Sequence, residues 1–119
     1  MNNPPRAPLR GEVWDFRLDP TEGHEQGSIR PCLVVSNDRL NQSRAELTII
    51  VPMSSKLRAI TSHIVINPPE GGLTDPSDIM CEHVRSLSTD RLMRYRGDVN
   101  RTTILSVEAA LRRLLAMNP

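Results

Sequence analysis

Aromatic residues are scarce in this sequence, which has one Trp, one Tyr and one Phe among 119 residues. RNA-binding modules that stack bases on aromatic side chains need a larger supply. Trp14 and Phe16 fall on one face of the alternating segment 12–18, which indicates core packing. Only Tyr95 remains as a residue that could stack on a base.

Cysteine is also sparse, and long apolar runs are absent. Cys32 and Cys81 both lie in apolar segments, so we expect two buried thiols in a reducing cytoplasm, with no metal-binding pattern. No apolar run approaches the roughly 18 residues that a membrane-spanning helix needs. The first ten residues lack the apolar stretch of a signal peptide and contain three prolines. We therefore expect residues 1–9 to be a disordered arm and the protein to be cytoplasmic.

Lysine is nearly absent, because Lys56 is the only lysine among fifteen basic residues. Arginine favours bidentate contacts with phosphate. A genome that favours arginine codons would produce the same bias, and the net charge of +1 neither requires nor excludes a nucleic acid. The arginine content alone therefore decides nothing.

Several common catalytic motifs are missing. The sequence has no G-x-S-x-G elbow, no phosphate-binding Walker loop and no G-x-G-x-x-G segment. The three histidines, His24, His63 and His83, are far apart and lack the spacing of metal ligands. His63 stands at the start of an expected strand, which favours a structural role. The sequence thus predicts no metal site and no cofactor.

Short apolar and β-branched segments separated by turn residues predict a mostly β protein. Strands are expected over 12–18, 30–37, 46–53, 62–66 and 78–87, the last as one or two strands, with another near 93–96. Residues 38–45 are expected to be irregular. Pro52 is expected at the end of its strand or on an exposed edge.

The hydrophobic period changes in the C-terminal segment. Five apolar residues are spaced for one helix face, namely Ile104, Val107, Leu111, Leu114 and Leu115. Asn100 is a suitable N-cap, and Asn118-Pro119 would end the helix. The whole pattern predicts a small, mostly antiparallel β-barrel closed by a C-terminal helix, in a single domain over residues 10–119.

Polar residues gather where the expected strands end. Arg30 opens the second strand, Ser54 and Ser55 close the third, His24 and Glu25 lie in the preceding loop, and Glu82, His83 and Arg85 lie in the segment CEHVR. Strand ends from different hairpins can meet on one rim of a small barrel. A guanidinium, a hydroxyl, a carboxylate and an imidazole at one rim suit a phosphodiester. RNA carries its own nucleophile in the 2′-hydroxyl, so such a site needs no metal.

Each of these residues has a simpler explanation. Arg30 could pair with Asp38 or Glu25. The two serines could be turn residues. Glu82 and Arg85 could form an ordinary exposed ion pair.

Four blocks taken together resemble the MazF/PemK toxin family. They are RGEVW…LDPTEGHEQGSIRPCLVVSND, IIVPMSSK, SHIVI and CEHVRSLSTDRL, and the resemblance spans residues 10–117. It implies an SH3-like barrel that forms a homodimer and that a cognate MazE-like antitoxin inhibits. It also implies a metal-independent, sequence-specific endoribonuclease. Attack of the 2′-hydroxyl of single-stranded mRNA on the adjacent phosphate would leave a 2′,3′-cyclic phosphate and a 5′-hydroxyl.

The resemblance also implies roles for individual residues. Arg30 matches the arginine of the family's Arg-Pro pair, and Ser54 stands where the family usually has threonine. His24, Glu25 and Gln26 match a mobile loop that touches RNA. The expected catalytic residues are Arg30, Ser54, Glu25 and Glu82, with Glu25 or Glu82 as the base. The expected RNA-binding residues are His24, Gln26, Ser55, Lys56, His83 and Arg85.

Two positions depart from the family pattern. In the PemK-like branch of the family, an arginine at one of these positions is the proposed acid, and this sequence has Met80 there instead. His83 stands where many MazF-like members have a glutamine. On a continuous strand, His83 would share a face with Cys81 and Arg85, opposite Glu82. Two alternatives stay open. One is a toxin of the same fold that inhibits DNA gyrase. The other, which rests on the two departures, is a non-catalytic protein that only binds its antitoxin.

Overall fold

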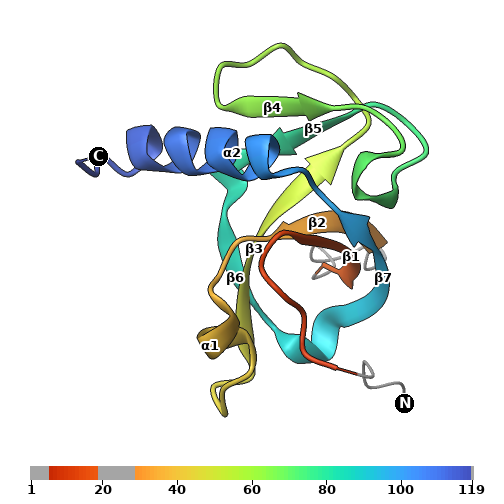
Figure 1. Ribbon diagram of the computed structural model, residues 1–119, viewed down its shortest axis with the longest axis vertical. Coiled ribbons are helices and arrows are strands. Elements are labelled where there is room, and N and C mark those ends of the chain that lie inside the picture. Colours follow the sequence, from red (N-terminus) through yellow and green to blue (C-terminus); the bar gives the residue numbers. More distant parts are fainter. Residues whose placement is uncertain (1–5, 19–28, 119) are drawn as a thin grey trace, which may run out of the picture.

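The computed structural model describes residues 6–18 and 29–118. Within these residues the chain forms seven strands, two α-helices and three short 3-10 helices (Figure 1). The strands are β1 (Glu12–Arg17), β2 (Ile29–Val34), β3 (Leu47–Ser54), β4 (His63–Ile66), β5 (Ser77–Met80), β6 (Arg85–Ser88) and β7 (Leu92–Asp98). The α-helices are α1 (Asp38–Asn41) and α2 (Arg101–Leu114), and the 3-10 helices are Glu70–Gly72, Cys81–His83 and Thr89–Arg91. The expected mostly β fold with a C-terminal helix is confirmed.

All of the strand pairs are antiparallel, in the order β4-β5-β3-β2-β1-β7, and β6 also pairs with β3. β3 is the shared strand. Along one edge it pairs with β2, and along the other it pairs first with β6 and then with β5. The chain therefore forms one curled sheet of β7, β1, β2, β3 and β6, from which β5 and β4 continue toward α2 (Figure 1).

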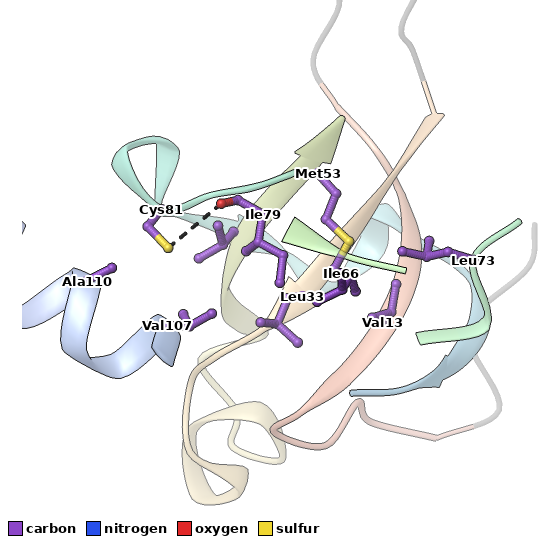
Figure 2. Packing of buried hydrophobic residues seen from close by; sticks show 10 residues of the cluster. Val13, Leu33, Met53, Ile66, Leu73, Ile79, Cys81, Val107 and Ala110 are labelled. Carbon is purple, nitrogen blue, oxygen red and sulfur yellow. Dashed lines mark hydrogen bonds between the residues drawn. The ribbon is translucent and has the colours of Figure 1, made fainter. Parts of the chain in front are cut away.

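The three central strands are buried on both faces, which the alternating pattern of β1 does not predict. Neighbouring residues enter different apolar clusters, as Val13 and Trp14 do in β1, Leu33 and Cys32 in β2, and Val51 and Ile50 in β3. One cluster lies between these strands, β4, β5 and α2 (Figure 2). The other holds Trp14, Phe16, Leu87 and Leu92 on the concave face of the curled sheet. Every residue of β1 except the exposed Arg17 is buried, so the strand is not the half-buried one that was expected.

Pro52 is buried inside β3, so its expected position at a strand end or exposed edge is wrong. Along the edge of β3 opposite β2, the pairing with β6 ends at Ile50 and the pairing with β5 begins at Met53. Proline has no N–H to donate to a ladder. It is tolerated here because it lies where β3 changes neighbours.

Residues 38–45 are not wholly irregular, because α1 begins there. The Asn37 side chain accepts the N–H of Leu40 at 2.8 Å and caps the helix. Asn41, inside α1, joins a buried polar network with Ser36 and Thr48. This network ties the β2–β3 connection to the sheet.

α2 packs on the sheet through a narrower face than expected. Val107 and Ala110 are buried, and Ile104 and Leu111 pack against the same cluster. Leu114 and Leu115 are 44% and 57% exposed, so their expected place on this face is wrong. The helix ends at Leu114 rather than at Asn118, and no helix in the described part of the chain is long and apolar enough to cross a membrane.

The N-terminal segment reaches the sheet from Arg6 onward. The Arg6 guanidinium makes two hydrogen bonds to the Glu12 carboxylate and lies 5.5 Å and 5.3 Å from the ring centres of Trp14 and Tyr95. Both cation–π contacts and the paired hydrogen bonds fix the side chain. Residues 6–9 therefore do not belong to a disordered arm.

Gly72→Ala should destabilise the fold much more than Gly11→Ala. Both glycines have positive φ, +69° and +93°. A Cβ at Gly72 would lie 2.0 Å from the Arg96 carbonyl oxygen, whereas at Gly11 the nearest atom is 3.7 Å away. We expect a loss of about 1–2 kcal/mol at Gly11 from the backbone alone, and at least about 3 kcal/mol at Gly72. Urea unfolding of the two variants measures both losses, and equal losses would contradict this packing.

Candidate active site

Two arginines lie on the concave face of the curled sheet, on either side of the level of Cys32. Arg85 pairs across the sheet with Ile50, and Ile50 pairs with Val34. Alternation along β2 places Cys32 and Arg30 on the face of Val34. Arg30 is near the start of β2 and Arg85 begins β6, and both strands run antiparallel to β3. The sheet therefore places both arginines on one face, with Arg30 near the start of β2 and Arg85 level with its last residue, Val34.

The Cys32 thiol lies within the electrostatic reach of both arginines. The pKa of this thiol is raised to about 12, mainly by burial; Arg30 and Arg85 oppose this rise and Asp15 adds to it. The thiol thus stays protonated at neutral pH and is no nucleophile. The second thiol, Cys81, is also buried, and burial raises its pKa to about 11.

Ser54 ends β3 at the same end of the β2–β3 pair. The last pair of this ladder is Cys32 with Pro52, and Arg30 and Ser54 each lie two residues beyond it. The Ser54 hydroxyl accepts the N–H of Lys56 at 3.1 Å, as in the expected turn. A hydroxyl that accepts one bond keeps its own proton for another acceptor. Ser54 can therefore shape the turn and still donate to a phosphate oxygen.

The turn after β3 exposes two of the expected RNA-binding residues. Ser55 and Lys56 are both exposed, directly after Ser54. The ammonium of Lys56 is thus at the surface beside the Arg30 end of the sheet.

Arg30 does not pair with Asp38. Among residues 6–18 and 29–118 no carboxylate forms an ion pair with Arg30, and Asp38 accepts the N–H of Arg10 at 2.8 Å. The other suggested partner, Glu25, lies outside the described residues, as do His24 and Gln26. A guanidinium that forms no ion pair with a carboxylate of the protein is suited to an anionic ligand.

Glu82 turns away from Arg85 and toward β4. Its carboxylate accepts the Ser62 hydroxyl at 2.6 Å and lies 2.6 Å from the His63 ring at Nε2. The other ring nitrogen, Nδ1, lies 2.9 Å from the Asp78 carboxylate. The suggested ion pair between Glu82 and Arg85 is therefore wrong, and Glu82 belongs to a chain of four polar side chains.

The two middle members of this chain, His63 and Glu82, have shifted pKa values. For His63, burial lowers the pKa, but the hydrogen bonds and charges of Asp78 and Glu82 outweigh burial and raise it. For Glu82, burial raises the pKa, but the bonds from Ser62 and His63 outweigh burial and lower it to about 2. At neutral pH the Glu82 carboxylate is therefore ionised and a weak base.

His83 does not lie on a strand. Cys81–His83 forms a 3-10 helix between β5 and β6, so the expected face shared by His83, Cys81 and Arg85 is wrong. The His83 side chain is 60% exposed, 3.6 Å from the Glu82 carboxylate. Met80, the other departure from the family pattern, ends β5 directly across from His63.

Little in the sequence indicates the buried pair His63 and Asp78. His63 was expected to be structural, and Asp78 was hidden as the first residue of an apolar segment. A charged residue that begins a buried strand is the one available signal, because buried charges need a partner. Within the described residues no group of three or more His, Cys, Asp or Glu could hold a metal ion.

Comparison with known proteins gives one consistent result. A family model described as PemK-like, MazF-like toxin of type II toxin-antitoxin system matches residues 9–115. Endoribonuclease MazF9 of Mycobacterium tuberculosis is 32% identical, over 87% of this chain and 92% of that protein. Crystalline MazF of Deinococcus radiodurans has a TM-score of 0.79 at 25% identity, over 93% and 98% of the two chains. A mycobacterial endoribonuclease solved with its cognate antitoxin has a TM-score of 0.73 at 26% identity, over 95% and 99%.

Glu82→Gln should reduce the loss of stability in acid. The folded protein holds the pKa of Glu82 below its ordinary 4.5, at about 2. Its contribution is therefore complete above pH 4.5 and is lost as the pH falls toward 2. The variant should lose less free energy of unfolding between pH 5 and 2 than the parent, as urea unfolding at each pH measures. Parallel pH profiles would contradict the ion pair with His63.

Proposed function

Since the chain belongs to the family of PemK-like, MazF-like toxins of type II toxin–antitoxin systems, we propose that it is an endoribonuclease that cleaves single-stranded mRNA at specific sequences without a metal ion. The observation that carries the proposal is Arg30 and Ser54 at one end of the β2–β3 ladder, with Arg85 on the same face of the sheet. The Arg30 guanidinium and the Ser54 hydroxyl can both donate to the oxygens of one phosphodiester. The family assignment supplies the reaction that such a group of residues can perform.

The reaction is an internal transfer of the phosphoryl group. A base removes the proton of the 2′-hydroxyl, the 2′-oxygen attacks the adjacent phosphorus, and the bond to the 5′-oxygen breaks. The leaving 5′-oxygen takes up a proton. The products are therefore a 2′,3′-cyclic phosphate and a 5′-hydroxyl. Arg30 stabilises the negative charge that grows on the phosphate oxygens, and Arg85 belongs to the proposed RNA-binding residues. Arg30 acts by charge, because a guanidinium does not release its proton near neutral pH.

Glu25 is the better candidate for the base. Glu82 is bound to His63 and Ser62, and its lowered pKa makes it a poor proton acceptor. Glu25 lies five residues before Arg30 in the sequence, within the segment that resembles the family's RNA-contacting loop. His24 and Gln26 of that loop, with Ser55, Lys56 and the exposed His83, complete the proposed RNA-binding set. Ser54 donates a hydrogen bond from its hydroxyl to a phosphate oxygen.

The partners follow from the same family. We propose that the toxin domain covers residues 10–119, that it works as a homodimer in the cytoplasm and that a MazE-like antitoxin inhibits it. The mycobacterial endoribonuclease that was solved with its cognate antitoxin supports this, at 26% identity over 95% of this chain. Buried, unpaired Cys32 and Cys81 are consistent with a reducing compartment.

The direct test incubates the protein with a long single-stranded RNA in excess EDTA and maps the ends of the products. We expect discrete cuts with 5′-hydroxyl ends. A DNA gyrase supercoiling assay beside it covers the alternative target. Intact RNA together with inhibited gyrase would favour the gyrase toxin, and no effect in either assay would favour the non-catalytic, antitoxin-binding protein.

Arg30→Ala should lower the cleavage rate at least about a hundredfold, because removing one donor to the developing charge costs roughly 3–4 kcal/mol of transition-state energy. Arg39→Ala is the matched control, since Arg39 is an exposed arginine of α1. Single-turnover cleavage measures both rates, and circular dichroism confirms folding. A folded Arg30→Ala protein that cleaves at the parental rate would remove Arg30 from the mechanism.

Glu25→Gln and Glu82→Gln separate the two candidate bases. Loss of a general base lowers the rate about a hundredfold to ten-thousandfold. We expect a loss in this range for Glu25→Gln and a loss of roughly tenfold or less for Glu82→Gln. Single-turnover rates at neutral pH measure both, and the reverse order would make Glu82 the base.

A further inference from the structure

His63 is a buried imidazole held between two carboxylates from different elements. Its side chain is 2% exposed, on β4. Asp78 of β5 approaches Nδ1 at 2.9 Å, and Glu82 of the 3-10 helix Cys81–His83 approaches Nε2 at 2.6 Å. The Asp78 side chain is fully buried, whereas that of Glu82 is 32% exposed. Three neighbouring segments thus meet at one ring.

With both carboxylates ionised, the geometry calls for a proton on each ring nitrogen. An ionised carboxylate only accepts hydrogen bonds, and a neutral imidazole has one N–H and one bare nitrogen. Both short contacts are therefore favourable only when His63 is an imidazolium. In the neutral form, one of the two carboxylates would face a nitrogen lone pair.

Asp78 links this ring to the proposed catalytic end of β3. It lies directly across from Ser54 in the β3–β5 ladder. Its Oδ2 atom also accepts the N–H of Arg58 at 2.9 Å, in the loop that follows β3. Its Oδ1 atom is buried without a partner among the described residues. Among the described residues, the buried Asp78 carboxylate has hydrogen bonds only with the Arg58 N–H and the His63 ring. Its position therefore depends on His63, since a buried charge needs a partner.

We propose that His63 and Asp78 are positioning residues of the ribonuclease site, and that they hold the loop of residues 55–62, with Ser55 and Lys56, in register with Ser54. Neither residue touches the RNA. His63 holds Asp78, Asp78 holds the backbone of Arg58, and the Ser54 hydroxyl holds the backbone of Lys56. The expected effect on the rate of cleavage rests on the proposed function. The position of the loop rests only on the contacts given above.

Loss of the His63 proton should loosen this arrangement. The groups that face the ring are Asp78 from β5 and Glu82 from the 3-10 helix, with His83 beside Glu82. On the α2 side, Arg113 lines a small pocket with Ser62. When the ring becomes neutral, Glu82 can turn to water because it is partly exposed, whereas Asp78 cannot. A raised His63 pKa means that the arrangement is complete at lower pH and is lost as the pH rises through that pKa.

The experiment measures kcat/KM for cleavage of a single-stranded RNA against pH, in EDTA, for the parent, His63→Gln and Asp78→Asn. The matched control is Asp38→Asn, because the Asp38 carboxylate also accepts one backbone N–H, from Arg10, but has no histidine partner. NMR of the unmodified parent follows the titration of the His63 ring. Hydrogen exchange of the Arg58 amide follows the loop without any RNA.

We expect the parental rate to fall on the alkaline side over the pH range in which the His63 ring titrates. In His63→Gln this fall should disappear, and kcat/KM at low pH should drop about tenfold, because small misplacements of site residues slow catalysis. In Asp78→Asn the fall should move to lower pH, since a carboxylate that favours the imidazolium is lost. Asp38→Asn should match the parent. The protection of the Arg58 amide, which is the intrinsic exchange rate divided by the observed rate at the same pH, should fall in both site variants and as the parent's ring loses its proton.

The outcomes separate this proposal from the proposed function. If the parent cleaves RNA and His63→Gln keeps its rate and pH profile, the positioning role is overturned. If the alkaline fall does not coincide with the titration of the ring, it is overturned as well, and this result needs no variant to fold. If the parent cleaves no RNA, the proposed function fails. A loss of Arg58 amide protection on ring deprotonation, beyond the intrinsic rise of exchange with pH, would then still support the positioning of the loop, and unchanged protection would overturn it.

Discussion

β3 pairs with β2 along one edge, and with β6 and then β5 along the other, while both of its faces are buried. Its two faces separate the apolar clusters, so the concave sheet and the layer of β4, β5 and α2 share one strand. The proposed site depends on this arrangement. Arg85 reaches the face of Arg30 only because β6 pairs with the first half of β3, and Asp78 reaches Ser54 only because β5 pairs with the last residues.

The sequence predicted the strands well because each is a short apolar segment between turn residues. It could not predict that Pro52 would be internal, since that depends on a change of neighbours along β3. It also placed Leu114 and Leu115 in the core by helical spacing, whereas the packing of α2 ends earlier. Spacing reports which residues share a face, but only the tertiary structure decides how far along the helix that face is covered.

For the site, the resemblance to a family pointed to Arg30 and Ser54, and the structure places them at the same end of the sheet. The region of Glu82 shows the limit of such reasoning. A continuous strand was assumed there, but Cys81–His83 is a 3-10 helix, so alternation gives no face for His83. The contact of Glu82 with His63 joins residues 19 positions apart and depends on buried Asp78. No local pattern in the sequence encodes such a contact.

The charges divide the molecule into two electrostatic regions. At the Arg30 end, the guanidinium of Arg30 forms no ion pair with a carboxylate of the described residues, which suits a phosphate. At the His63 end, the cation is held between two carboxylates and the charge is compensated within the protein. The first region is proposed to bind RNA, and the second to keep the neighbouring loop in place.

The central claim is that the RNA's own 2′-hydroxyl is the nucleophile. The most direct measurement places a single 2′-deoxynucleotide on the 5′ side of a mapped cut, in an otherwise unmodified RNA, and follows cleavage in excess EDTA. The account predicts that cleavage at that position is abolished while other cuts persist. Cleavage of the modified bond at the normal rate would contradict it.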